Sequence, residues 1–358
     1  MKPRSITLLD VAREAGVSRA TVARVLSATG YVGDETRLRV EQAVRVTGYR
    51  PNVMARSLRT QRTFTIGHIL LEMTSNPFFA HVARAVEGEA LRHGYKSLLF
   101  NHYKNKEAER FGVERFIERQ VDAVIFTYPI DGESLAILKA AEMPVVQIER
   151  RQSGDTDAVL VDNRQGIAMA MQHLLQLGHR RIGFIGGDPA LYPHWAGEPH
   201  SIEDERLGAY LDALREAGVS PDPELVRLGE YSRLDDGSNI EGYRHMQALL
   251  ALKEPPTAVL AACDILAAGV LRATYEARLR IPDDLSVVGF DDTLAAHLAP
   301  RLTSVAQPMA KLGLTAFQLA LAAIENPDHT PRTVTLSPQL ILRESTGPVP
   351  RIAPTIRG

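Results

Sequence analysis

The segment 18–26 places arginine, hydroxyl and small side chains on one face of a predicted helix. At helical spacing, Val22 and Val25 face inward, whereas five polar or small residues face outward or lie on the flanks. These five are Arg19, Ala20, Thr21, Ala23 and Arg24. Arginine pairs with guanine in the major groove of DNA, and small side chains allow a helix to approach closely. The pattern therefore predicts a recognition helix with Ser18 as its N-cap.

Two further helices are needed to position this segment. An apolar stripe at i, i+3, i+4 and i+7 predicts a preceding helix, formed by Leu8, Val11, Ala12 and Ala15. Thr7 and Asp10 have the spacing of a capping box, and Gly16 is placed to end this helix. A third helix is predicted from Asp34 to Gly48. Together these features predict a three-helix, helix-turn-helix headpiece at residues 1–49.

Positive charge is concentrated at the N-terminus. Residues 1–62 contain twelve Lys or Arg and five Asp or Glu, a net charge of +7, whereas the whole chain has a net charge of −2. The remainder is therefore acidic, at −9. A basic module joined to an acidic body is typical of a DNA-binding domain attached to a second functional unit. We expect double-stranded DNA as a partner.

The composition limits the possible classes of protein. With 358 residues and 45% hydrophobic content, the chain is long enough for more than one domain. Its single cysteine excludes an internal disulfide framework. Neither a membrane-spanning apolar run nor a signal-peptide pattern is recognisable. These features predict a cytoplasmic protein with no membrane association.

From Thr63 onward, short apolar runs alternate with helical patterns. The predicted strands are Ile66–Leu71, Ser97–Phe100, Ala123–Phe126, Val145–Ile148, Val159–Val161, Ile182–Ile185, Ala258–Ala261 and Ser286–Phe290. The predicted helices include Phe79–His93, Ala108–Arg119, Gly166–Leu177, Arg206–Ala217, Asn239–Ala251 and Leu266–Ala277. This alternation predicts an α/β fold with parallel sheets covered on both faces. The number of strands favours two doubly wound lobes.

Ordered motifs along almost the whole chain resemble the LacI/GalR family of bacterial transcription regulators. The motifs in the first part are Asp10-Val11-Ala12, Ala15-Gly16-Val17-Ser18, Gly48-Tyr49, Pro51-Asn52 and Ala55-Arg56-Ser57-Leu58. Those in the body include Asn76-Pro77-Phe78-Phe79, Val161-Asp162-Asn163, Cys263-Asp264 and Val288-Gly289-Phe290-Asp291-Asp292. The resemblance implies that the two lobes have the type I periplasmic-binding-protein fold.

The resemblance also implies an order of domains. A hinge helix and linker at 50–62 would follow the headpiece, and residues 63–358 would bind effector and form a homodimer. We expect lobe one at about 63–161 and 292–326 and lobe two at about 162–291 and 327–346. The chain would then cross between the lobes near Asp162, near Asp291–Asp292 and near Asn326–Pro331.

Nine residues are predicted to contact DNA. They are Thr7, Ser18, Arg19, Ala20, Thr21, Arg24, Asn52, Ala55 and Leu58. Arg19 is the expected base reader, Ala20 can offer only a methyl contact, and the hydroxyls and Arg24 are expected to hold phosphates. By resemblance, residues 52–59 fold as a hinge helix on DNA, and Leu58 enters the minor groove.

Seven residues are predicted to contact a small effector at the carboxyl ends of strands, in the cleft between lobes. They are Phe78, Phe79, Glu149, Arg150, Arg206, Tyr231 and Asp264. An arginine and an aspartate can each form two hydrogen bonds with vicinal hydroxyls, which favours a sugar or sugar derivative. A nucleobase between two aromatic rings is the alternative. Glu149 and Cys263 depart from the family pattern, which has Asp and Asn at these positions.

No enzymatic motif is apparent. The chain contains no Walker loop, nucleophile elbow or His-Glu-x-x-His sequence, and its histidines have no convincing metal-ligand spacing. We therefore predict no catalytic residues, no metal and no cofactor. A sugar-modifying enzyme and a transporter-associated solute-binding protein are the remaining alternatives, and the basic headpiece argues against both.

Overall fold

The computed structural model describes residues 6–27, 30–49, 62–192, 200–231, 241–326 and 328–350. The chain divides into two compact units, Met1–Thr63 and Phe64–Gly358. We call the first unit the headpiece and the second the body. Each unit has its own hydrophobic core.

The headpiece contains three helices, α1 (Leu8–Ala15), α2 (Arg19–Ser27) and α3 (Asp34–Thr47). The predicted cap at Thr7 is present, because its backbone N–H donates to the Asp10 carboxylate at 2.8 Å. Gly16 ends α1 with a left-handed φ of +65°, which glycine adopts without steric cost. Gly48 ends α3 in the same way, at a φ of +66°. Local capping residues thus set the helix boundaries.

The three helices enclose a small apolar core. The buried residues are Val11, Ala12, Ala15, Val22, Val25, Val32, Val40 and Ala43. Three of the four predicted inward residues of α1 belong to this set, as do Val22 and Val25 on α2, whereas Leu8 is partly buried against it. The helical periodicity therefore identified the packed faces of α1 and α2.

The body contains two six-stranded sheets, each of which defines a lobe. The first sheet has the strand order β11-β5-β4-β3-β1-β2, and all of its pairings are parallel. Its strands are β1 (Thr65–Leu70), β2 (Lys96–Asn101), β3 (Ala123–Thr127), β4 (Val145–Ile148), β5 (Asp157–Val161) and β11 (Thr333–Leu336).

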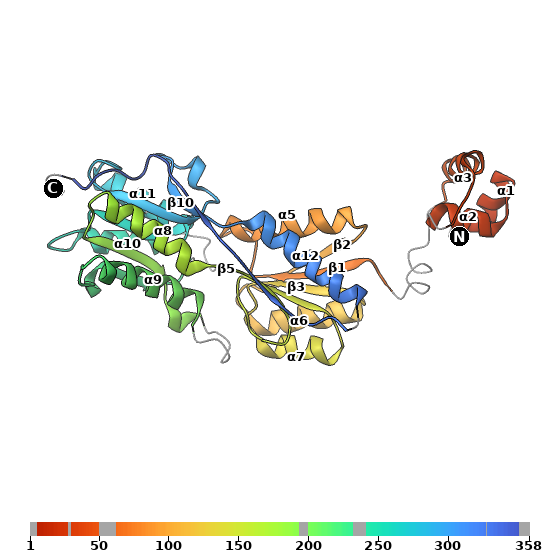
Figure 1. Cartoon of the computed structure of the whole chain (residues 1–358), viewed down its shortest axis with the longest axis horizontal. Helices are drawn as coiled ribbons and strands as arrows, with labels where there is room; N and C mark the ends of the chain where they lie inside the picture. The colour runs from red at the N-terminus through yellow and green to blue at the C-terminus, as the bar shows by residue number, and fades with distance from the viewer. Residues whose placement is uncertain are drawn as a thin grey trace. The chain divides into compact units, whose positions relative to one another are not determined.

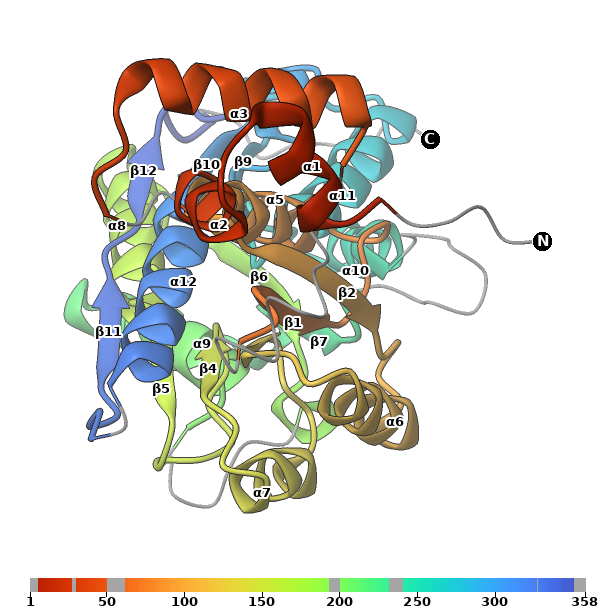
Figure 2. The same ribbon diagram turned by 90° about the vertical axis from the view of Figure 1, so that its right-hand side faces the viewer.

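Helices cover both faces of the first sheet. One face carries α5 (Pro77–Arg92) and α12 (Met309–Glu325), which also pack against each other (Figure 2). The other face carries α6 (Lys106–Glu118) and α7 (Gly132–Ala140). The continuous burial of β1 and β3 follows from this arrangement, because a parallel sheet between two helical layers has no solvent-facing side.

The second sheet repeats this design (Figure 1). Its order is β12-β10-β9-β8-β6-β7, and only the β10–β12 pair is antiparallel among the pairings described. The strands are β6 (Ile182–Gly187), β7 (Val226–Gly229), β8 (Ala258–Ala261), β9 (Ser286–Asp291), β10 (Thr303–Ala306) and β12 (Gln339–Ile341). The helices α8 (Asn163–Gln176) and α9 (Ile202–Glu216) cover one face, and α10 (Glu241–Leu250) and α11 (Asp264–Glu276) cover the other.

The second crossing between lobes differs from the expectation. We expected it near Asp291–Asp292, but β10 continues the second sheet beside β9. The chain therefore crosses at Gln307–Pro308, between β10 and α12. The segment 303–306 belongs to lobe two rather than lobe one, because its backbone hydrogen bonds are made with β9 and β12.

The third crossing also lies later in the chain than expected. After α12, β11 pairs with β5 and so belongs to the first sheet. The crossing falls at Ser337–Pro338, between β11 and β12, rather than near Asn326–Pro331. The assignment of residues 327–346 to lobe two was therefore wrong for β11. The first passage follows β5, at Asp162.

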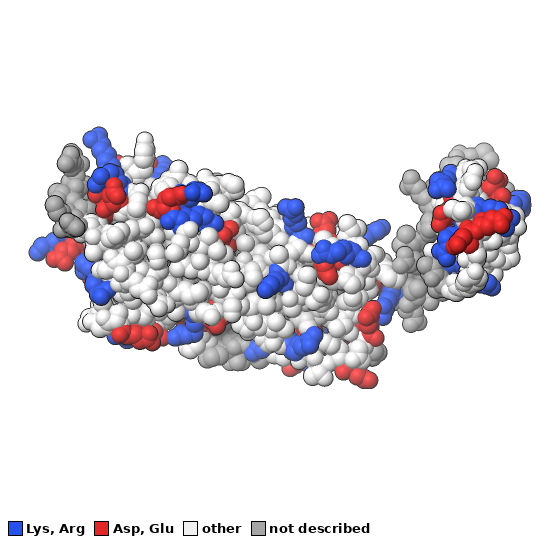
Figure 3. Space-filling model, turned by 45° about the horizontal axis from the view of Figure 1, so that its top comes forward, with Lys and Arg blue, Asp and Glu red and all other residues white. Residues whose placement is uncertain are grey.

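The visible surface of the body carries positive and negative side chains mixed together (Figure 3). On the face shown in Figure 3, Lys and Arg side chains of the body lie among Asp and Glu in small groups. In the part of the chain that the structure describes, no helix combines the length and the apolar character that a membrane span requires.

Candidate DNA-binding face and interlobe cleft

The outward face of α2 presents the side chains that the sequence predicted for DNA contact. Arg19, Ala20 and Arg24 are exposed, whereas Val22 and Val25 are buried beneath them. The Ser18 hydroxyl caps the helix by accepting the backbone N–H of Thr21 at 3.1 Å. This cap fixes the first turn of α2, the part of a recognition helix that enters the major groove.

Thr7 and Thr21 stand in different local environments. The Thr7 hydroxyl donates to Asp10 at 2.7 Å, so it stabilises the start of α1. The Thr21 hydroxyl lies 2.9 Å from the Ser18 hydroxyl on α2. The predicted hinge contacts Asn52, Ala55 and Leu58 lie outside the residues that the structure describes.

A cavity of about 50 Å³ lies between the two lobes, at the carboxyl ends of the strands. We call it the inner cavity. Five of the seven predicted effector residues line it, namely Phe78, Phe79, Glu149, Arg206 and Tyr231. Phe78 and Phe79 follow β1 and are also part of the core of lobe one. Glu149 follows β4, whereas Arg206 and Tyr231 come from lobe two.

Asp264 does not line the inner cavity, contrary to the sequence-based expectation. Its side chain is fully buried, and its two oxygens accept hydrogen bonds from Thr293 N (2.7 Å), Leu294 N (3.1 Å) and Ser304 Oγ (2.7 Å). A Cβ atom on Gly289 would approach the Asp264 carboxylate to 2.5 Å, so glycine there makes room for it. Asp264 therefore ties α11 to the loop between β9 and β10.

The aspartate at the cavity is Asp291, at the end of β9. Its carboxylate accepts Asn76 Nδ2 at 3.0 Å and Gln307 Nε2 at 2.7 Å. Burial raises the Asp291 pKa, and the positive charge of Arg206 acts in the opposite direction. The sequence analysis had treated Asp291 as a feature of the lobe crossing. The bond from Asn76 joins lobe one to lobe two.

Arg206 is held rigidly at the cavity wall. Its Nε donates to Asn163 Oδ1 at 2.9 Å, and its Nη1 donates to the Ala262 carbonyl at 2.8 Å. The guanidinium also stacks over the Phe290 ring, 4.1 Å from the centroid. A guanidinium fixed in this way loses little further conformational freedom when it binds a ligand.

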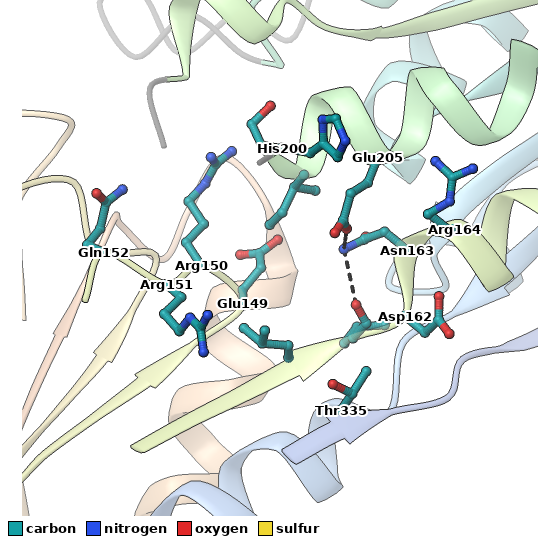
Figure 4. A pocket seen from close by; sticks show the side chains of 14 residues that line it. Glu149, Arg150, Arg151, Gln152, Asp162, Asn163, Arg164, His200, Glu205 and Thr335 are labelled. Atoms are coloured by element: carbon teal, nitrogen blue, oxygen red, sulfur yellow. Dashed lines mark hydrogen bonds between the residues drawn. The ribbon is translucent and has the colours of Figure 1, made fainter. Parts of the chain in front are cut away.

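Glu149 lies between two cavities. It lines the inner cavity and also a second space of about 170 Å³, shown in Figure 4. Figure 4 places Glu149 between Arg150 and the bonded pair Asn163–Glu205. Burial raises the pKa of Glu149 to about 7, although Arg206 and Arg150 oppose this shift. Its Oε2 is buried without a hydrogen-bond partner, so it is available to a ligand hydroxyl.

Arg150 lies beside the inner cavity rather than in its lining. Its guanidinium packs over the Tyr128 ring at 4.2 Å and forms a buried ion pair with Glu203 at the start of α9. Arg150 is in lobe one and Glu203 is in lobe two, so this pair is a second polar contact between the lobes. Buried pairs of this kind constrain geometry more reliably than they add stability.

Four non-glycine residues at the cleft have positive φ angles. Tyr128 and Glu149 directly follow β3 and β4, and Asp291 is the last residue of β9; their φ angles are +70°, +70° and +99°. Lys104, which follows β2, has a φ of +59°. All four residues line the inner cavity. Such angles cost about 1–3 kcal/mol each for non-glycine residues and tend to cluster at functional sites.

The sequence analysis missed several cavity residues. They are Lys104, Tyr128, Tyr192, Cys263 and Asp291, with Leu71, Ser75 and Asn76. Tyr128 and Asp291 follow strands, so the rule that ligands bind at the carboxyl ends could have found them. Tyr192 lies after the short helix Pro189–Leu191, and its hydroxyl accepts the Tyr231 N–H at 2.9 Å. No local pattern marks that contact.

Metal binding finds no support in the described residues. Among them, no group of three or more His, Cys, Asp or Glu side chains could hold a metal ion. Cys263 is buried and free. The arrangement as a whole offers hydrogen bonds, charges and aromatic rings to an organic ligand.

A three-helix DNA-binding headpiece followed by a two-lobed body with a polar, aromatic cleft defines a ligand-responsive regulator of transcription. Two family models agree with this class. Residues 7–52 match the description "Bacterial regulatory proteins, lacI family", and residues 171–346 match "Periplasmic binding protein-like domain".

Similarity to individual proteins extends over nearly the whole chain. The HTH-type transcriptional repressor PurR of Edwardsiella ictaluri is 33% identical over 351 residues, which cover 97% of this chain and 98% of that protein. The length of this match and its sequence identity show that this chain belongs to the LacI family. The chain is a DNA-binding transcriptional repressor of that family, and the relatives are regulators rather than enzymes.

Solved structures support the same assignment. A lac repressor dimer bound to operator and an anti-inducer has a TM-score of 0.79 at 26% identity, covering 96% of this chain and 100% of that one. A complex of the transcriptional regulator CelR with cellobiose has a TM-score of 0.70 at 29% identity, covering 95% and 99%.

Proposed function

We propose that this repressor is controlled by a sugar or sugar derivative bound in the inner cavity. The observation that carries the proposal is the combination of a fixed guanidinium and a carboxylate, Arg206 and Asp291, in a cleft that is lined by aromatic rings from both lobes. Vicinal hydroxyls donate to a carboxylate and accept from a guanidinium, and apolar faces of a sugar ring pack on aromatic rings.

Two unpartnered groups support a ligand with several hydroxyls. Glu149 Oε2 and the Tyr231 hydroxyl are buried at the cavity without hydrogen-bond partners. Leaving such groups unpaired is costly, and a polyhydroxylated ligand would pair both. The similar structure of CelR in complex with cellobiose is consistent with this class of ligand.

A nucleobase remains the alternative effector. Phe79, Tyr192 and Tyr231 all line the cavity and could face a base. A flat base would require two parallel aromatic faces, whereas the ring pairs described there are inclined, at 44° for Tyr192 with Tyr231 and 83° for Phe79 with Tyr128. The aromatic geometry therefore favours the sugar over the base.

The DNA-binding role is assigned to individual residues. Arg19 reads a base, preferably guanine, because it is exposed on the face of α2. Ala20 makes a methyl contact, and Ser18, Thr21 and Arg24 position the helix on phosphates. Thr7 is a further DNA contact. We assign residues 1–49 to the headpiece, 50–62 to the hinge and 63–358 to effector binding and dimerisation. In the hinge, Asn52, Ala55 and Leu58 would contact the minor groove on DNA.

The protein acts as a homodimer on a pseudo-palindromic operator in this proposal. The edge strand β2 exposes Leu98 and Leu99, and Leu91 at the end of α5 is 73% exposed. An exposed apolar edge strand is unfavourable in a monomer, so a second copy is the expected cover. Two-fold symmetry of the dimer would then match two half-sites of the operator.

Effector binding would change the relative position of the lobes and thereby the operator affinity. The contacts Asn76–Asp291 and Arg150–Glu203 join the lobes at the cleft, so a ligand there acts directly on the interlobe geometry. By linkage, an effector that weakens DNA binding must bind the DNA complex more weakly by the same factor.

A ligand screen followed by operator titration tests the proposal. Thermal shift of the purified protein is measured with sugars, sugar derivatives and purine bases, and each hit is added to operator-bound protein. We expect a sugar-class hit that changes the operator affinity. A response only to a purine base would favour the alternative, and operator binding that no hit changes would contradict effector control.

A further inference from the structure

We propose that the effector carries an anionic group, a phosphate ester or a carboxylate, which binds in a second cavity beside the inner one. This inference rests on the proposed function and specifies the chemical class of its ligand. This cavity, here called the outer cavity, has a volume of about 220 Å³ and is distinct from the 170 Å³ space of Figure 4. Its basic lining residues are Lys104, Lys106 and Arg150.

The outer cavity adjoins the inner cavity. Lys104, Tyr128 and Tyr192 line both, so a single ligand can reach from one to the other. The outer cavity is the larger, at about 220 Å³ against about 50 Å³. A ring bound between Arg206 and Asp291 would therefore project its substituent past Tyr128 and Tyr192.

The two cavities differ in charge. The inner cavity is lined by two cations, Lys104 and Arg206, and two carboxylates, Glu149 and Asp291. The outer cavity is lined by three cations, and its described lining contains no Asp or Glu. A neutral, hydroxyl-rich ring suits the first environment, whereas an anion suits the second.

Arg150 provides a buried donor for the anion. It is 6% exposed, and its Nε has no hydrogen-bond partner among the described atoms. Its Nη2 is occupied by Glu203, and its plane is held over Tyr128. A fixed guanidinium whose Nε–H has no described acceptor is a suitable donor to a carboxylate or phosphate oxygen.

The two lysines bring mobile positive charge to the same space. Lys104 Nζ lies 5.3 Å from the centroid of the Tyr192 ring and 4.0 Å from Glu230 Oε2. That ion pair is long and half exposed, so it competes weakly with a ligand. Lys106 is the first residue of α6, whose positive dipole end adds to the attraction for an anion.

Matched pairs of probes test this inference. Binding is measured by isothermal calorimetry for glucose and glucose 6-phosphate, ribose and ribose 5-phosphate, and glucose and glucuronate, with inorganic phosphate as a separate probe. We expect a charged member to bind at least about tenfold more tightly than its neutral partner, with an affinity that falls as salt is raised. The phosphate and carboxylate arms distinguish the two anionic groups.

The exposed Lys106 supplies a variant that leaves the packed core unchanged. Lys106→Gln should lower the affinity for the charged probe about fivefold and leave the affinity for its neutral partner unchanged. Adding Lys104→Gln should lower the affinity for the charged probe further. Lys253→Gln is the matched control, because Lys253 is exposed and precedes β8 at the opposite end of the strands from the cleft.

The outcomes separate the inference from the proposed function. If neutral sugars bind as tightly as their charged partners, or if Lys106→Gln leaves the charged probe unaffected, the anionic site is wrong while the sugar effector stands. If no charged probe binds, the inference fails as well. If no sugar of either kind binds and operator binding persists, both the inference and the sugar class are overturned.

Discussion

The face of α2 and the cleft between the lobes present their functional side chains in opposite ways. On α2, Arg19 and Arg24 are exposed, and the period of one helix sets their direction. In the cleft, Arg206 and Asp291 are buried and are held by partners that are distant in the sequence. A local pattern is therefore sufficient to find the first site, whereas the second depends on how distant segments pack.

The same contrast has an energetic consequence. An exposed side chain on α2 can be replaced with little effect on folding, because it contributes few contacts in the free protein. A buried polar residue near the cleft has partners that become unsatisfied when it is removed. Substitutions in the two regions should therefore separate effects on DNA binding from effects on stability and effector response.

The largest effect is expected for Asp264→Ala. Removing this carboxylate leaves the N–H groups of Thr293 and Leu294 and the Ser304 hydroxyl without their acceptor. We expect a loss of about 3–5 kcal/mol in the free energy of unfolding, measured by urea denaturation of the body. The exposed Asp283→Ala on the same lobe is the control. A stability equal to that of the control would show that Asp264 is not structural.

Asp291→Asn should act mainly on the effector. The substitution removes the charge at the cavity but keeps the size of the side chain, so we expect effector affinity to fall about 10–100-fold. Operator affinity without effector should stay the same. Calorimetry with the effector and fluorescence anisotropy with operator DNA measure the two quantities. Unchanged effector affinity would move the ligand site away from Asp291.

Arg19→Ala tests the headpiece side of the comparison. Loss of one bidentate base contact should cost about 1–3 kcal/mol of operator binding and relax the preference at one base pair. Arg39→Ala on the exposed part of α3 is the control for lost positive charge. Selection of binding sites from random duplexes measures the preference. An identical selected sequence for Arg19→Ala and the parent would refute base reading by Arg19.

The most gradual effect is a pH dependence at Glu149, which is small per pH unit and spread over several units. Burial raises its pKa to about 7, above the ordinary value of 4.5. Its stabilising contribution is therefore complete below about 4.5 and is lost as the pH rises through about 7. Relative to Glu149→Gln, the parent should lose stability over this window, by at most about 1.4 kcal/mol per pH unit.

Urea denaturation at several pH values between 5 and 8 measures this difference, with the exposed Glu142→Gln as control. A parent whose stability relative to Glu149→Gln does not change with pH would indicate that the Glu149 carboxyl is well solvated. That result would also weaken the case for its unpartnered Oε2 as a ligand contact.

The headpiece was largely predictable from the sequence because its signals are local. The boundaries of α3 follow from Asp34 and Gly48, and the packed face of α2 follows from Val22 and Val25. The eight predicted strands of the body are also present, because each contains a continuous apolar run, which is buried in all of them except the edge strand β2.

The missed strands gave weaker signals. Four strands were not predicted: β7, β10, β11 and β12. Each has only three or four residues, and β7, β11 and β12 are at most partly buried, so none of them shows a long apolar run. The pairing of β10 with β9 and of β11 with β5 also moved the lobe crossings to Gln307–Pro308 and Ser337–Pro338. These crossings depend on which distant strand each segment pairs with, and no local pattern encodes that choice.

The choice between Asp264 and Asp291 illustrates the limit at the site. Both residues follow strands of the second sheet, so the carboxyl-end rule applies to both. The positive φ of Asp291 and its partners Asn76 and Gln307 keep it at the cavity, whereas Asp264 is enclosed by backbone N–H groups. The sequence analysis named only Asp264 as an effector residue, and the long-range contacts place Asp291 at the cavity instead.

The measurement that tests the central claim most directly is the operator affinity with and without effector, in the parent and in Asp291→Asn. Fluorescence anisotropy with a selected inverted-repeat duplex provides both constants at fixed salt. We predict that effector changes the operator affinity of the parent by at least about fivefold and leaves that of Asp291→Asn unchanged. An unchanged affinity in the parent, or an equal change in the variant, would contradict control of the headpiece from the interlobe cleft.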